Sequence, residues 1–203
     1  MRLPGLTLCL VLSGSAVARA EAAPLEALRF DNLQDLRLQS REQRRSTGLW
    51  LFGWGAANAG AGALVAAIGH DREPWLAAGL TAASFGVINA LLSPSLLDLS
   101  GARLHRIQAT RPKAAADYRR VREEELVAQL KSGQTFAFNF GLDVAYITAG
   151  VLLYVVGRAR TPETGWEEGC GLTIAGEGLF LLGFDLLEWW STGRRAERFR
   201  ALP

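Results

Sequence analysis

Residues 171–185 read GLTIAGEGLFLLGFD, an apolar, glycine-rich run that nevertheless contains Glu177 and Asp185. The run belongs to a segment, 171–190, that is long enough as a helix to cross a hydrocarbon core of about 30 Å. Because an ionised carboxylate at the centre of a bilayer costs at least about 2.5 kcal/mol, we expect both acids to face the interior of a helical bundle. The stretch therefore predicts a membrane protein that keeps its polar groups inside.

Three earlier segments have the same length and apolar character. Segments 48–69 and 74–97 contain no charged residue, and segment 136–157 contains only Asp143. Glycine inside a helix costs about 1 kcal/mol in water, whereas in lipid it lets two helices approach closely. The many glycines thus argue against a soluble bundle. We expect an all-α fold, a polytopic membrane four-helix bundle.

The remaining segments surround two predicted transmembrane hairpins, 48–97 and 136–190. Residues 1–20 resemble a signal peptide, with an apolar core and small residues at Ala18 and Ala20. We expect cleavage after Ala20 because the apolar core is too short to span a bilayer; an uncleaved anchor is the alternative. The other segments are an amphipathic N-terminal helix (21–47), a charged linker helix (98–135) broken at Pro112 and helical over 114–131, and a basic tail (191–203).

The two hairpins share a sequence pattern that indicates an internal repeat. Residues 79–86, GLTAASFG, match residues 171–178, GLTIAGEG, at an offset of 92 positions, and glycines of the preceding helices match at an offset of 88. Two such blocks in the same order predict a duplication. Because each unit contributes two helices, both hairpins would insert in the same sense, related by an axis along the membrane normal.

Glycines on the predicted helix faces are expected to pack rather than to carry chemistry. Between helices in lipid there is no hydrophobic driving force, so small residues four positions apart serve to bring backbones into contact. The glycines expected at helix contacts are Gly55, Gly60, Gly62, Gly150 and Gly178.

Polar side chains within the apolar segments form the candidate site. Asn139, Asp143 and Tyr146 follow one another at spacings of four and three, so they share one helix face. The complete set adds the acids of the last segment and two amides of the first hairpin: Asp143, Glu177, Asp185, Asn139, Tyr146, Asn58 and Asn89.

Two interpretations of these residues are open from the sequence. In one, the acids bind a cation or relay a proton, since ionisable residues within a membrane are functional by default. In the other, they form hydrogen bonds across helices, with partners such as Asn58 or Tyr146, and fix the register of the bundle. Asp185 lies near the end of its segment, so Asp143 and Glu177 are the stronger candidates for function.

Several other function classes lack support in the sequence. The net charge is only +2, which argues against binding to nucleic acid. The two cysteines and two histidines lack metal-ligand spacing, so we expect no metal and no cofactor. Because we find no Ser–His or Cys–His arrangement, phosphate-binding glycine loop or paired-aspartate protease motif, we predict no catalytic residues and no enzyme activity.

The basic residues conflict with the signal-like segment over orientation. Residues 21–47, 98–135 and 193–203, here called the arginine-rich face, contain five, eight and four lysines and arginines; the two hairpin loops contain three. The positive-inside rule places the arginine-rich face in the cytoplasm, but a cleaved signal peptide would place it outside. We favour the charge rule.

Three stretches carry a resemblance to a known kind of protein. They are STGLWLFGWGAANAGAG (46–62), FNFGLDVAYITAGVLLYVVG (138–157) and GEGLFLLGFDLL (176–187). With them the sequence resembles a family of uncharacterised bacterial four-helix integral membrane proteins with a signal-like N-terminus. The resemblance implies an integral membrane location, in the inner membrane of a bacterium, and it brings no substrate or catalytic residue.

The expected function follows from the apolar architecture. The leading hypothesis is a structural or partner-binding membrane component whose partners are the lipid bilayer and either a second copy of the chain or another membrane protein. The alternative is a small ion- or proton-coupled carrier that uses the intramembrane carboxylates Asp143 and Glu177.

Overall fold

A computed structural model describes residues 7–160 and 165–203, with the backbone alone for residues 7–28. The expected signal-like segment therefore lies partly outside the described residues. Every regular element in the described part of the chain is a helix, which confirms the all-α fold. The elements are α1 (Thr7–Ile68), α2 (Glu73–Leu92), α3 (Pro94–Leu97), α4 (Ala102–Ala109), α5 (Ala115–Ala159) and α6 (Trp166–Ala201).

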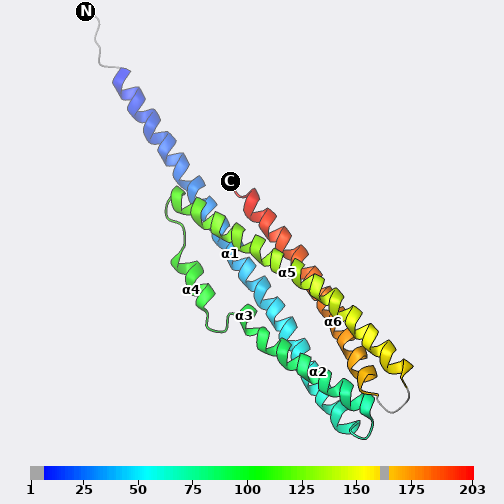
Figure 1. Cartoon of the computed structure of the whole chain (residues 1–203). Helices are drawn as coiled ribbons and strands as arrows, with labels where there is room; N and C mark the ends of the chain where they lie inside the picture. The colour runs from blue at the N-terminus through cyan, green and yellow to red at the C-terminus, as the bar shows by residue number, and fades with distance from the viewer. Residues whose placement is uncertain (1–6, 161–164) are drawn as a thin grey trace, which may run out of the picture.

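The four long helices form two antiparallel hairpins; the C-terminal ends of α1 and α5 and the N-terminal ends of α2 and α6 lie at the same end of the molecule (Figure 1). Helix α1 pairs with α2, and α5 pairs with α6; the two hairpins meet mainly through α2 and α6. The backbones of α2 and α5 do not contact one another. The helices thus follow the order α1, α2, α6, α5 across the bundle.

The distribution of polar and apolar side chains is the reverse of that in a soluble bundle. Large apolar side chains point outward, with 74% of Ile68 and 60% of Leu152 exposed. Within the same segments Asn89, Asp143 and Glu177 are only 3–4% exposed. Each of the four long helices is long and apolar enough to cross a membrane. This arrangement fits a membrane protein.

Glycines bring the two helices of each hairpin into backbone contact. A Cβ atom added to Gly62 would lie 2.4 Å from the backbone nitrogen of Ala83, and one added to Gly150 would lie 2.4 Å from that of Ala175. The two contacts are separated by 88 positions on the first helix and 92 on the second, the offsets seen in the sequence. Larger residues at these glycines would therefore force the helices apart.

The other glycines expected at helix contacts divide into two groups. Gly55 lies against Ala90 of α2, and Gly178 lies against Ile147 of α5. Gly60 differs, because a Cβ atom at this position would have nothing within 4 Å. Gly60 is exposed on the outer face of α1, away from the other described helices.

Helices α1, α5 and α6 continue beyond the apolar segments without a break. Pro112 separates α4 from α5 as predicted, but α5 then runs on to Ala159 instead of ending near residue 131. The continuous helices are possible because their ends pack together on the arginine-rich face. The small core there consists of Leu33, Leu36, Tyr118, Val121 and Phe199.

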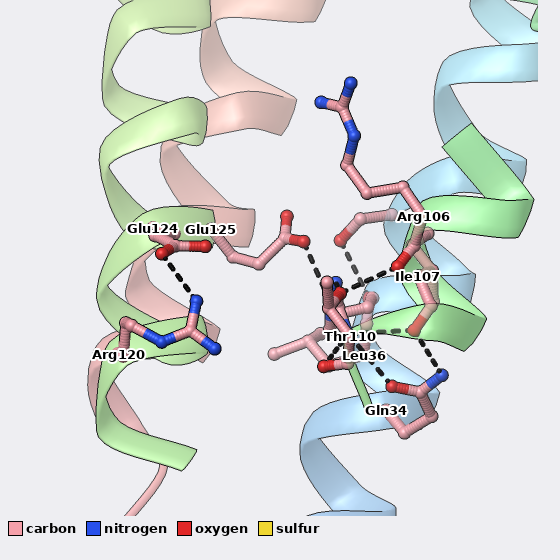
Figure 2. Close-up of polar contacts among 10 residues, drawn as sticks. Gln34, Leu36, Arg106, Ile107, Thr110, Arg120, Glu124 and Glu125 are labelled. Carbon is pink, nitrogen blue, oxygen red and sulfur yellow. Dashed lines mark hydrogen bonds and ion pairs between the residues drawn. The ribbon is translucent and has the colours of Figure 1, made fainter. Parts of the chain in front are cut away.

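A buried arginine ties three helices together beside this core. Arg37 of α1 pairs with Glu125 of α5 at 2.9 Å and donates to the backbone oxygens of Ile107 and Thr110 at 3.1 and 3.3 Å. Figure 2 shows the labelled partners Gln34, Ile107, Thr110 and Glu125 around this point. The linker after α3 is thereby fixed against α1 and α5.

Candidate functional site

Two clefts lie between helices that do not pack closely. The α2–α5 cleft has a volume of about 790 Å³ and is also lined by residues of α1, α3 and α6. The α1–α6 cleft has a volume of about 700 Å³. Both lie toward the arginine-rich ends of the apolar segments, and Phe184 lines both. Five of the candidate polar residues line the α2–α5 cleft: Asn89, Asn139, Asp143, Tyr146 and Asp185. Glu177 and Asn58 line neither cleft and lie between α1 and α6.

The α2–α5 cleft contains an acid pair at its base. Asp143 of α5 and Asp185 of α6 lie within hydrogen-bonding reach of one another, and Asn139 lies within reach of Asp185. Both acids are at most 5% exposed. Among the described residues, Oδ2 of Asp143 has no hydrogen-bond donor and Nδ2 of Asn89 has no acceptor. This cleft therefore holds buried polar groups whose bonding is incomplete.

The close packing of α5 on α6 explains why the two acids meet. Asp143 follows the spacing of Gly150 on α5, and Asp185 continues the seven-residue spacing of Gly171 and Gly178 on α6. All of these residues are buried, because they lie on the two faces that the glycines bring together. Residues on such a shared stripe necessarily approach one another.

The third acid, Glu177, lies on the side of α6 that faces α1. It accepts a hydrogen bond from the indole Nε1 of Trp54 at 3.1 Å and another from Nδ2 of Asn58. The ring of Trp54 also stacks on Phe180, with 3.8 Å between ring centroids. Glu177 is thus a bonded clamp between α1 and α6. The sequence interpretation missed Trp54, although its four-residue spacing to Asn58 places both on one helix face.

Between α2 and α5 the positions that match Glu177 and Asn58 in sequence hold aromatic residues. At offsets of 92 and 88 positions, Glu177 matches Phe85 and Asn58 matches Tyr146. Phe85 and Tyr146 meet edge to face, with ring centroids 6.2 Å apart. Tyr146 therefore lines the α2–α5 cleft beside the acid pair. An aromatic contact replaces the hydrogen-bonded clamp.

The two clefts also differ at their ends near the arginine-rich face. In the α1–α6 cleft Glu188 accepts a hydrogen bond from Thr47 at 2.6 Å and pairs with Arg195 at 3.5 Å. In the α2–α5 cleft the charged lining residues at this end are Arg44 and Lys131. Sequence reasoning did not single out Arg44 and Lys131, because in the sequence they resemble ordinary solvated charges.

The chemistry available to the acid pair is the binding of a proton or a cation. Two carboxylates in contact and away from water cannot both remain ionised unless a positive charge lies between them. Among the described residues no group of three His, Cys, Asp or Glu side chains could hold a metal ion. The walls of the cleft are largely apolar and include Phe85, Phe136 and Phe184.

Comparison with known proteins places the chain in a family without assigning its activity. Neither a curated protein nor a solved structure matches the chain. Residues 50–186 match the family described as a family of unknown function, DUF6992. The matched range includes every residue of the candidate site, in both hairpins. The chain therefore belongs to the DUF6992 family of unknown function.

Proposed function

We propose that the chain is an integral membrane protein that binds a small organic cation in the α2–α5 cleft in exchange for a proton. The observation that carries this proposal is the Asp143–Asp185 pair. It lies at the base of a cleft among apolar helices, and it forms no ion pair with any described lysine or arginine. This conclusion develops the carrier hypothesis and assigns the acid role to Asp185 in place of Glu177.

The exchange follows from the charge of the pair. Without ligand, one proton shared between Asp143 and Asp185 supplies the hydrogen bond that Oδ2 of Asp143 lacks. When an organic cation enters, it takes the place of the proton between the two carboxylates, and the proton leaves to water, so the net charge of the site is unchanged. The cation and the proton exclude one another because both must approach the same carboxylate oxygens.

The shape and lining of the cleft favour an organic cation over a bare metal ion. A volume of about 790 Å³ is in the range of cavities that hold drug-sized molecules. Aromatic rings such as Phe85 and Tyr146 attract cations through their faces and also offer apolar contact. Because α2 and α5 do not touch, a lipophilic cation could enter between them from the bilayer.

A binding experiment tests the proposal directly. The full chain, purified in a neutral detergent, is titrated with tetraphenylphosphonium in weakly buffered solution, and bound cation and released protons are measured together. We expect saturable binding with release of about one proton per cation. Asp143→Asn and Asp185→Asn should each reduce binding at least about tenfold, since each removes half of the negative charge.

Glu177→Gln is the matched control, because Glu177 is a buried acid of the same apolar segment that is already bonded to Trp54 and Asn58. It should bind tetraphenylphosphonium as the wild type does. Binding without proton release, or equal losses in Glu177→Gln and Asp143→Asn, would contradict the exchange. No binding by a folded wild-type protein would reject the proposed function.

A second candidate function is supported by the outer face of α1. Gly53, Ala57 and Gly60 are exposed there at helical spacing, and nothing lies within 4 Å of a Cβ atom at either glycine. Such small residues allow a second helix to approach in lipid. This surface supports a structural or partner-binding component, with a second copy of the chain as its partner.

Three finer points belong with the proposal. The recurrence of glycine contacts at the two offsets supports an internal duplication of the hairpin. The resemblance of the sequence to bacterial membrane proteins with a signal-like N-terminus supports the inner membrane of a bacterium as the location. The abundance of basic residues supports a cytoplasmic arginine-rich face.

A further inference from the structure

Two cations line the α2–α5 cleft at its arginine-rich end, and a third lies beside one of them. Arg44 of α1 and Lys131 of α5 line the cleft, and Arg103 of α4 lies close enough to repel Arg44. Among the described residues, none of the three forms an ion pair. Like charges that converge without a counter-charge are unfavourable unless an anion joins them.

Burial of Arg44 and Arg103 raises the energetic cost of leaving them without a counter-charge. Burial and the neighbouring guanidinium groups of Arg103 and Arg195 lower the pKa of Arg44 to about 10, so this side chain is still charged at neutral pH. Nη1 of Arg103 is buried and has no hydrogen-bond partner in the described part of the chain. A buried donor without an acceptor is costly, which indicates that a bound group supplies one.

The acids nearest to Arg44 are already engaged elsewhere. Glu125 and Glu188 both act on Arg44 electrostatically. However, Glu125 is paired with Arg37 at 2.9 Å, and Glu188 is paired with Arg195 at 3.5 Å. These two carboxylates therefore neutralise other arginines. A counter-charge for Arg44 and Arg103 must come from an anion outside the chain.

The position of the cations indicates what kind of anion this is. Arg44 lies four residues before segment 48–69 and Lys131 five residues before segment 136–157, so both lie where the apolar segments begin. From Lys131 the helix rises about 18 Å to Asp143, which keeps the two sites apart. Hydroxyl groups of Ser95 and Ser132 line the same end of the cleft. Phosphate groups of lipids occupy this level of a membrane.

We propose that Arg44, Arg103 and Lys131 bind the phosphate of an anionic phospholipid at the mouth of the α2–α5 cleft. The guanidinium groups match phosphate oxygens in geometry as well as in charge. The acyl chains would lie along the open seam between α2 and α5, where Ile88 and Leu92 are more than half exposed. A free phosphate ion would leave this apolar surface uncovered, so the lipid is the better occupant.

The test compares two lipids that differ only in their headgroup. The full chain in a neutral detergent receives phosphatidylglycerol or phosphatidylcholine with identical acyl chains, and thermal unfolding and bound lipid, by native mass spectrometry, are measured. We expect phosphatidylglycerol to raise the Tm and to stay bound. Phosphatidylcholine should give little change, and so should inorganic phosphate at the same concentration. The measurement does not depend on organic-cation binding.

Substitutions locate the site. Arg44→Gln and Arg103→Gln should each weaken phosphatidylglycerol binding about fivefold or more, as expected for one lost basic contact. In lipid-free detergent neither should lower the Tm, because each removes a cation that has no partner. Arg45→Gln is the control: Arg45 is exposed on the same helix and should leave lipid binding unchanged.

Three results would overturn the inference. One is an equal Tm shift with both lipids, which would show that only the acyl chains are bound. Another is the same shift with inorganic phosphate alone, which would identify a site for the free ion. The third is an equal loss of phosphatidylglycerol binding in Arg45→Gln and Arg44→Gln, which would show a general attraction to the arginine-rich face.

Discussion

The α1–α6 cleft and the α2–α5 cleft each lie between the first helix of one hairpin and the second helix of the other. Between α1 and α6 the acids have partners: Glu177, outside the cleft lining, accepts from Trp54 and Asn58, and Glu188, which lines the cleft, is paired with Arg195. Between α2 and α5, Oδ2 of Asp143 and Nδ2 of Asn89 have no hydrogen-bond partner among the described residues.

This difference in hydrogen bonding distinguishes buried acids that stabilise the fold from buried acids that could bind a ligand. A buried acid whose oxygens all accept hydrogen bonds contributes to stability, and its removal leaves donors without acceptors. A buried acid without a donor does not stabilise the folded chain, and it persists where a ligand or proton completes it. By this criterion we expect Glu177 to be structural and Asp143, whose Oδ2 has no donor among the described residues, to belong to a binding site.

The largest effect is expected where the helices that bound the clefts touch. Gly171→Val should destabilise the protein by about 3 kcal/mol, because even a Cβ atom there would lie 2.3 Å from the backbone nitrogen of Tyr154. Gly176→Val, on the same helix with nothing within 4 Å, is the matched control and should change stability by less than about 1 kcal/mol. Denaturant unfolding in detergent measures both. Equal losses would show that helix propensity, not close packing, is the cause.

The second effect compares two buried acids, Glu177 between α1 and α6 and Asp143 in the α2–α5 cleft. Glu177→Ala should cost about 2–4 kcal/mol, since it leaves buried donors of Trp54 and Asn58 without an acceptor. Asp143→Ala removes a carboxylate oxygen that has no donor in the described part of the chain, and it should be neutral or stabilising. Denaturant unfolding in detergent measures the stability of both variants. A greater loss of stability in Asp143→Ala than in Glu177→Ala would invert the proposed division of roles.

The smallest effect concerns the linker that borders only the α2–α5 cleft. Asp98 accepts hydrogen bonds from the backbone nitrogens of Arg103 and Leu104 and from Arg41, and these bonds lower its pKa. A lowered carboxyl pKa in the folded state stabilises above the unfolded value of about 4, and the stabilisation is lost as the pH falls through the folded value.

Asp98→Asn should therefore lower the Tm at pH 7, and the difference from the wild type should shrink as the pH falls from about 5 to 3. Tm is measured against pH for both proteins. Because the other acids are present in both, the difference between the two curves isolates the contribution of Asp98. A difference that stays constant with pH would show that Asp98 acts through its shape and not through its charge.

Much of the architecture could be predicted from the sequence because the apolar segments have a physical length requirement. Apolar segments with few or no charges, each long enough to span a bilayer, correspond to parts of α1, α2, α5 and α6. The ends of the helices were less predictable. Helix α5 extends to both sides of residue 135, because the contacts that continue it come from Leu33 and Phe199, which are remote in sequence.

The candidate site was accessible from the sequence only in part. Spacing alone puts Asn139 and Asp143 on one face of α5. It could not tell which acid of α6 meets Asp143, because this depends on the register of α5 against α6. Asp185 looked too close to a helix end, yet α6 continues to Ala201, so that Asp185 is well inside the helix. The bonding of Glu177 to Trp54 likewise needs the tertiary structure.

The unbroken course of α5 has a mechanical consequence. A single helix of 45 residues carries Asp143 in the cleft and, near its other end, Tyr118 and Val121 in the core of the arginine-rich face. Because a helix without a hinge resists twisting and bending, it acts as a rigid shaft. Any rotation of α5 that widened the cleft would also move Tyr118 and Val121 in that distant core. A ligand bound in the cleft, within the bilayer, would thereby change the protein surface outside it.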